Sequence, residues 1–245
     1  MLLNDKFTSL MTPELKQKIQ ISLGAAILIA GVRTAYILYQ RYEEAHPAVT
    51  RELPLNADYY VVPKKLHAYD LQSAKDLTKQ PVWVKEGYRY TYYPYDHGRA
   101  DFKQEAGLLL PIEKLQVTDV VTEASPGQPG QRQVLAVFEK DGKSYAVPIG
   151  LVKGSDYQIY SDEMLYIQDP HELYKHWTAE TWAAIDQHQV KPGMNELQAD
   201  FAIGMGIPER SSDPQQVKTV NYPNGGKPVS ITYRDGKAAE IKNGS

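Results

Sequence analysis

The sequence predicts a single N-terminal transmembrane helix followed by an α+β ectodomain. Three observations lead to this fold class. An apolar run lies near the N-terminus, short β-forming runs alternate with turn residues in the middle, and capped amphipathic helices precede short strands at the end. The chain therefore divides into a tail (1–18), a transmembrane helix (19–41), a stalk (42–57), a small antiparallel β barrel or sandwich (58–168) and a module of two to three helices with a three-stranded antiparallel sheet (169–245).

Composition and charge exclude several functional classes. The chain has 27 Lys and Arg against 30 Asp and Glu, and its first 41 residues contain five basic and two acidic residues, so the remainder carries a net charge of −6. An acidic ectodomain argues against nonspecific nucleic-acid binding, which needs a concentrated basic surface. The chain has no cysteine, which excludes disulfides, thiolate metal sites, thiol catalysis and a lipidated N-terminal cysteine.

Residues 19–39 form the predicted membrane span, in which Arg33 is the single charged residue. At 1.5 Å per residue the run is about 30 Å long, which is the thickness of the hydrocarbon core of a bilayer. A cleaved signal peptide would need a small-x-small site soon after the apolar run, but apolar helix continues beyond Val32. A buried core helix is disfavoured because apolar residues cover every face. We therefore expect a permanent single-pass anchor.

Flanking residues indicate the sidedness of this anchor. Basic residues precede the span and tyrosines follow it, namely Lys6, Lys16 and Lys18, then Tyr36, Tyr39 and Tyr42. The basic bias favours a cytoplasmic N-terminus and a periplasmic or extracytoplasmic ectodomain.

The predicted helix offers residues for a contact within the membrane. Gly24, Leu28, Gly31 and Ala35 share one helical face, where small side chains allow a partner helix to approach closely. Arg33 is placed to contact a partner or an anionic lipid, although snorkelling to the headgroups alone is the favoured explanation. The possible membrane contact therefore comprises Gly24, Gly31, Arg33 and Ala35.

Short strands with turn signals characterise the middle of the chain. Asp141-Gly142 joins two apolar runs and predicts a two-residue hairpin. Residues 157–160 and 164–167 are predicted to close a small barrel. Tyrosines alternate in one run and offer a possible binding surface for sugars or peptides, or else pack on the core: Tyr88, Tyr90 and Tyr92.

Helix caps and turns organise the C-terminal part. Asp169-Pro170, Thr178 and Asn195 each predict the start of a helix, and Gln198 completes a capping box with Asn195. Gly206 and Pro208 predict a helix end. Three strands follow, at residues 217–222, 229–233 and 237–241.

The order Lys191-Pro-Gly-Met194, amphipathic helix, Gly206-Ile-Pro208 and β-meander resembles the SmpA/OmlA (BamE-like) family over about residues 190–241. The resemblance implies two helices packed on a three-stranded antiparallel sheet, and a non-enzymatic, envelope-facing module that binds proteins. The chain lacks the lipobox cysteine of that family and has a transmembrane helix and a β region instead, so a role in outer-membrane assembly does not carry over.

Catalytic motifs fail on spacing. His171 and His176 are five residues apart, whereas a zincin needs histidines at i and i+4 on one helical face. The Gly204-Met-Gly206 run lacks the third glycine of a dinucleotide fingerprint and lies at a helix C-terminus, which repels phosphate. No nucleophile elbow or Walker motif is present. We therefore predict no catalytic residues, no cofactor and no metal.

These observations together predict a non-catalytic accessory, assembly or scaffold subunit of a bacterial membrane or envelope complex. Its expected partners are the lipid bilayer and other protein subunits, but not nucleic acid. The alternative is a peptidoglycan- or glycan-binding envelope protein that uses the tyrosine run, and a membrane-bound hydrolase is a distant third.

Overall fold

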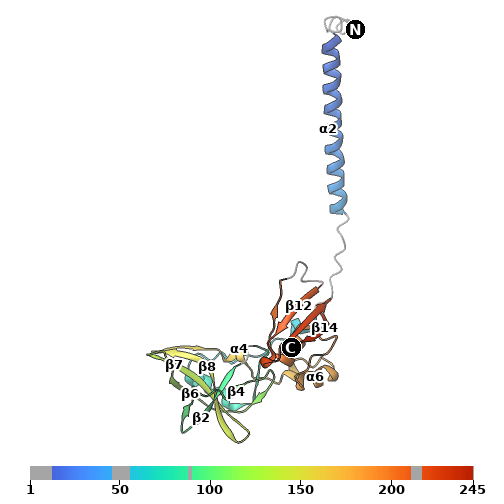
Figure 1. Cartoon of the computed structure of the whole chain (residues 1–245). Coiled ribbons are helices and arrows are strands. Elements are labelled where there is room, and N and C mark those ends of the chain that lie inside the picture. The colour runs from blue at the N-terminus through green and yellow to red at the C-terminus, as the bar shows by residue number, and fades with distance from the viewer. Residues whose placement is uncertain (1–12, 46–55, 88–89, 211–216, 245) are drawn as a thin grey trace. The chain divides into compact units, whose positions relative to one another are not determined.

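A computed structural model describes residues 13–45, 56–87, 90–210 and 217–244. The chain divides into two compact units, Met1–Leu55 and Asn56–Ser245 (Figure 1). The first unit contains the helix α2, and the second, hereafter the compact unit, contains every strand found among the described residues. Each is described separately below.

Helix α2 spans Pro13–Ala45, which is longer than the predicted 19–41. An 18-residue window of its segment Gln17–Tyr42 has a mean hydropathy of 1.8, so the helix is long and apolar enough to cross a membrane, and the side chains of this segment are exposed. The prediction of one apolar N-terminal helix is therefore confirmed. The extra turns arise because the flanking residues are good helix formers and Pro13 is favourable at a helix start, so the helix does not stop where hydrophobicity ends.

The N-terminal half of the compact unit is built around a curled, half-barrel antiparallel sheet (Figure 1). Its central strands follow the order β3-β2-β8-β7-β6, while β4 pairs with β2 and β9 with β8. The strands of this sheet are β2 (Thr91–Asp96), β3 (Arg99–Ala100), β4 (Gly107–Leu108), β6 (Val117–Ala124), β7 (Gln131–Lys140), β8 (Lys143–Lys153) and β9 (Asp156–Ile159).

The predicted hairpin at Asp141-Gly142 is confirmed. Lys140 pairs with Lys143 across it, and both turn residues have positive φ, at 52° for Asp141 and 72° for Gly142. Such a turn matches the right-handed twist of the flanking strands. The aspartate and glycine are therefore the residue types that this turn requires.

Closure into a complete barrel by residues 164–167 does not occur. Met164 ends the short helix α4 (Ser161–Met164), and the following strand β10 (Leu165–Tyr166) pairs with β1 (Val82–Val84) rather than with the large sheet. A third strand, β5 (Lys114–Leu115), pairs with the other edge of β1. The barrel does not close here because β10 places one side chain in each of two different cores.

The two principal cores meet at the β1–β10 pair. Val82 and Val84 belong to a cluster inside the half-barrel, hereafter the barrel core, whereas Trp83 belongs to a second cluster. Leu165 and Tyr166 divide in the same way. Because side chains of a strand alternate between its two faces, β1 and β10 separate the cores and contribute to both.

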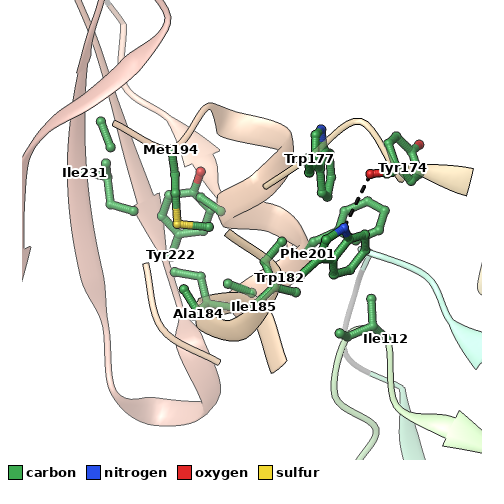
Figure 2. Packing of buried hydrophobic residues seen from close by; sticks show 14 of the residues in the cluster. Ile112, Tyr174, Trp177, Trp182, Ala184, Ile185, Met194, Phe201, Tyr222 and Ile231 are labelled. Atoms are coloured by element: carbon green, nitrogen blue, oxygen red, sulfur yellow. Dashed lines mark hydrogen bonds between the residues drawn. The ribbon is translucent and has the colours of Figure 1, made fainter. Parts of the chain in front are cut away.

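The second cluster, hereafter the tryptophan core, contains all three tryptophans of the chain. Figure 2 shows Trp177 and Trp182 around Phe201, with Ile112 reaching in from the β-rich half. The Trp177 and Phe201 rings meet edge to face at 5.1 Å between centroids. The core thus draws residues from both sides of the predicted boundary at 168/169.

Helices and a second sheet enclose the tryptophan core. Each predicted cap is confirmed, because the side chains of Asp169, Thr178 and Asn195 accept hydrogen bonds from the first-turn backbone N–H groups of α5, α6 and α7. The sheet has the order β11-β12-β13-β14, one strand more than predicted. The elements are α5 (Pro170–Leu173), α6 (Ala179–Asp186), α7 (Glu196–Ile203), β11 (Ile207–Pro208), β12 (Val217–Tyr222), η3 (Asn224–Gly226), β13 (Val229–Arg234) and β14 (Lys237–Asn243).

The extra strand β11 follows the predicted helix end at Gly206. An added Cβ at Gly206 would lie 2.4 Å from Val220 Cγ1 and 2.8 Å from the Tyr222 ring. Glycine therefore lets the chain pass close against β12, so that Ile207 and Pro208 pair with it.

Candidate interaction surface

The compact unit begins with an ordered segment, residues 56–70, hereafter the strap. It opens with the 3-10 turn η1 (Ala57–Tyr60) and continues without regular structure until Asp70 caps the short helix α3 (Leu71–Ala74), which leads into η2 (Lys75–Lys79). Val61 packs on the tryptophan core, whereas Leu66 and Ala68 pack on the barrel core. The strap therefore connects the two cores.

Side chains from distant parts of the chain fix the strap backbone. The Lys64 N–H donates to Gln168 Oε1 at 2.8 Å. The N–H groups of Leu66 and His67 donate to the two carboxylate oxygens of Asp162 at 2.8 and 2.9 Å. Because these bonds pair backbone groups that have no strand partner, they hold the strap in one extended path.

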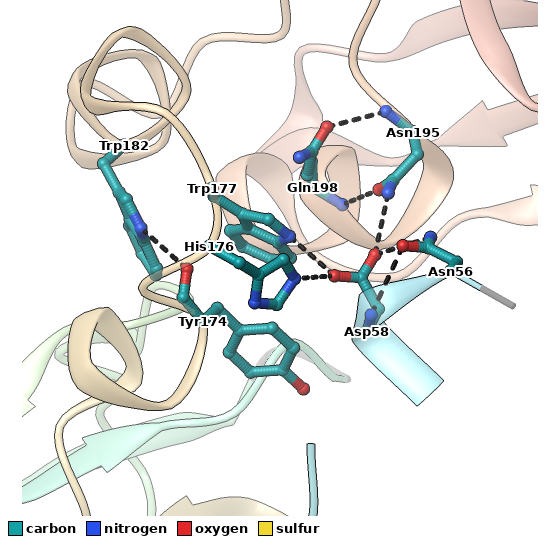
Figure 3. A network of polar contacts seen from close by, with 8 residues as sticks. All are labelled: Asn56, Asp58, Tyr174, His176, Trp177, Trp182, Asn195 and Gln198. Carbon is teal, nitrogen blue, oxygen red and sulfur yellow. Dashed lines mark hydrogen bonds and ion pairs between the residues drawn. The ribbon is translucent and has the colours of Figure 1, made fainter. Parts of the chain in front are cut away.

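Asp58 anchors the start of the strap to the tryptophan core (Figure 3). Its Oδ1 accepts a hydrogen bond from Trp177 Nε1 at 2.7 Å and lies 2.6 Å from His176 Nε2. Its Oδ2 accepts from Asn195 Nδ2 at 2.9 Å and from Asn56 Nδ2 at 2.8 Å. Four side chains thus converge on one carboxylate that is 8% exposed.

Burial and hydrogen bonding act in opposite directions on this carboxyl. Burial raises the pKa of Asp58, but the hydrogen bonds from His176, Trp177, Asn195 and Asn56 favour the charged form and together hold the pKa below its usual value. Asp58 is therefore an ionised acceptor that joins the strap to α7 and to the residues before α6.

The opposite side of the strap faces outward. From Tyr60 to Asp70 exposed and half-buried residues nearly alternate, with Lys64 and Lys65 both exposed. Tyr60 is 70% exposed, Val62 83% and Tyr69 75%. The outer face is defined as the exposed side chains of Tyr60, Val62, Lys64, Lys65, His67 and Tyr69.

The tyrosine run predicted as a binding surface lies elsewhere. Tyr88 is outside the described residues, and Tyr90 is half-buried against the barrel core. Tyr92 is 8% exposed, and its ring meets Phe138 and Tyr145 edge to face. Tyr92 therefore serves as a core residue, because strand β2 turns this side chain into the half-barrel.

Helix α2 places its predicted contact residues on two opposite sides. An added Cβ at Gly24 or Gly31 meets no other atom within 4 Å. At about 100° per residue, Ala35 shares the face of Gly24, whereas Arg33 lies about 180° from it. The face of Gly24, Gly31 and Ala35 is hereafter the glycine face. A partner helix packed on this face would therefore not reach Arg33.

The two histidines that resemble a zincin motif take different partners. His171 lies between Asp169 and Asp186, with its Nδ1 2.9 Å and its Nε2 3.1 Å from their carboxylates. Its ring also stacks on Trp182. His176 instead contacts Asp58. Within the described ranges no group of three or more His, Asp or Glu side chains is arranged to hold a metal ion.

An open pocket of about 450 Å³ lies beside the start of the strap. One of its lining residues is Asp200, whose Oδ1 is buried without a hydrogen-bond partner in the described structure. Burial, followed by the charge of the nearby Glu196 carboxylate, raises the pKa of Asp200 to about 7. The lining residues are Asn56, Asp58, Tyr59, Asn195, Glu196, Leu197, Asp200 and Gly236.

Sequence reasoning assigned the strap residues to a stalk and to the start of the β region, so it missed the outer face. One local signal was available: half-buried Val61, Leu66 and Ala68 stand between the polar and aromatic residues that point outward. The anchors of the strap, Asp162 and Gln168, had no local signal because they lie about a hundred residues away.

Comparison of the chain with protein families, with curated proteins and with solved structures gave no match. The function proposed below therefore depends on the sequence and the geometry of this chain.

Proposed function

We propose that this protein is a non-catalytic, membrane-anchored accessory or scaffold subunit of an envelope protein complex. Helix α2 crosses the membrane once, and the compact unit is displayed on the extracytoplasmic side. Other subunits bind the helix face and the compact unit.

One observation carries the proposal: the segment Gln17–Tyr42 exposes apolar side chains all round, and Gly24 and Gly31 leave one face open. Lipid acyl chains cover the apolar surface in a membrane, and the glycine face allows a neighbouring helix to pack closely. The resemblance of residues 190–241 to the SmpA/OmlA family supports a protein-binding role without catalysis.

A matched pair of helix variants tests the proposal. Ala35→Leu adds bulk to the glycine face, whereas Ala26→Leu adds the same bulk about 200° away from Gly24. Full-length protein is extracted from its native membranes in mild detergent, and the mass of the resulting complex is measured by light scattering. The parent and Ala26→Leu are expected to run as a complex larger than one chain, and Ala35→Leu as a smaller species, because bulk prevents close helix packing.

A lone monomer for the parent would contradict the accessory-subunit role. Equal complex sizes for the two variants would instead refute the helix face as the contact.

A further inference from the structure

We propose that the outer face of the strap binds the headgroup region of the same membrane that holds helix α2. This inference rests on the proposed anchoring of that helix and adds a second membrane contact, made by the compact unit. The occupant of the outer face is thus a lipid surface, and an anionic one binds best.

The length of the connection limits how far the start of the strap can lie from the end of α2. Ten residues separate Ala45, the end of α2, from Asn56, where the compact unit begins. Fully extended, this connection spans at most about 40 Å. The strap is the first described segment after the helix, so its effective concentration at the membrane surface is high, and a weak interfacial contact is sufficient.

The chemistry of the outer face matches the interfacial region of a bilayer. Tyr60 and Tyr69 combine an apolar ring with a polar tip, and Val62 lies beside them with 83% of its surface exposed. Lys64 and Lys65 interleave cations with these residues. Tyrosines and lysines together are typical of membrane interfaces, where the ring lies at headgroup depth and the ammonium reaches the phosphates.

The charge of the outer face contrasts with that of the compact unit. The first 55 residues contain six basic and five acidic residues, so residues 56–245 hold 21 basic and 25 acidic residues, a net of −4. The two acidic residues of the strap, Asp58 and Asp70, both point their carboxylates at hydrogen-bond donors of the protein. The outer face is therefore locally basic on an acidic unit, which favours an anionic surface.

The fixed backbone favours a surface over a protein pocket as the partner. Asp162 and Gln168 hold residues 64–67 in place, so the outward side chains are presented without reordering. A protein-binding hot spot needs a packed apolar centre with a polar rim. The outer face instead places Lys64 and Lys65 between its apolar residues, which suits a flat interface of mixed polarity.

Single-cysteine labelling of the full chain tests this inference, because the natural sequence has no cysteine. Val62→Cys reports on the outer face, Ala30→Cys on the middle of α2, and Ser155→Cys on an exposed turn between β8 and β9. Each variant carries one fluorophore and is reconstituted into phosphatidylcholine vesicles with or without phosphatidylglycerol. Spin-labelled lipids carry the spin either at the headgroup or in the middle of the acyl chain. Each spin quenches the fluorophores that lie at its own depth in the bilayer.

The headgroup spin is expected to quench the Val62 label at least about twofold more than the Ser155 label, and more strongly with phosphatidylglycerol present. Adding Tyr60→Ser, Lys64→Glu and Lys65→Glu is expected to reduce the quenching at position 62 to that at position 155. Tryptophan fluorescence confirms that these exposed changes leave the fold intact.

The Ala30 label separates failure of the inference from failure of the anchor. If the acyl-chain spin quenches position 30 while positions 62 and 155 behave alike, the strap does not contact lipid and the inference is overturned, but the anchor stands. If position 30 is not quenched, the anchor fails and the inference fails with it. Quenching at position 62 that persists in the charge-reversed variant also overturns the inference, because the outer face would not be making the contact.

Discussion

Replacing Asp58 by Ala is expected to lower the free energy of unfolding of the compact unit by about 2 to 4 kcal/mol. The carboxylate is 8% exposed and accepts from the side chains of Trp177, Asn195 and Asn56 while contacting His176. Removing it leaves these polar groups without their partner, and the Trp177 N–H has the least access to water as a substitute. The strap also loses its link to α7.

Tryptophan fluorescence during urea unfolding of the full chain in mild detergent measures this effect. All three tryptophans lie in the tryptophan core, so the signal reports on the structure that Asp58 holds. Asp96→Ala is the matched control, because the Asp96 side chain is 85% exposed, and it should change stability by less than about 0.5 kcal/mol. Equal midpoints for the two variants would show that the Asp58 network contributes nothing to stability.

Asp200→Asn is expected to stabilise the protein at alkaline pH and to have little effect at acidic pH. The folded-state pKa of Asp200 is about 7, above its ordinary value of 3.8, chiefly because the carboxyl is buried and next because Glu196 lies near it. The folded state therefore binds this proton more tightly than the unfolded state does. As pH rises from about 4 to about 7 the parent loses stability, because the unfolded carboxyl ionises freely whereas the folded one keeps its proton.

The size of this stability difference follows from the shift in the pKa of Asp200. The stability of Asp200→Asn relative to the parent should rise by about 2 to 4 kcal/mol between about pH 4 and pH 8. Unfolding curves of both proteins across this range give the difference at each pH, which removes the titration of all shared groups. A flat profile for Asp200→Asn would mean that its carboxyl is not perturbed.

The strap shows why the candidate surface could be predicted only in part. The turn-and-alternation pattern of residues 57–69 is visible in the sequence, but the partners of Asp58 are not. His176, Trp177 and Asn195 lie 118, 119 and 137 residues further along the chain. No local pattern identifies a hydrogen bond across such a separation, so the sequence places Asp58 only as the first residue of the predicted β region.

The large sheet shows the same limit. The Asp141-Gly142 turn could be predicted because its conformation depends on two adjacent residues. Whether the sheet closes could not be predicted, since this depends on where residues 165–166 pair, and they pair with β1 about eighty residues earlier. Tyr92 illustrates the consequence: alternation alone does not tell which face of its strand meets a core.

The sequence by itself determined the apolar helix, the helix caps at Asp169, Thr178 and Asn195, and the central hairpin, because each depends on hydrophobicity or hydrogen bonds within a few residues. The tertiary structure decided the rest. It divided the side chains of β1 between two cores, buried Asp58 among four partners and turned one side of the strap outward. Those outcomes depend on packing between distant segments, which the chain acquires only when both cores form together.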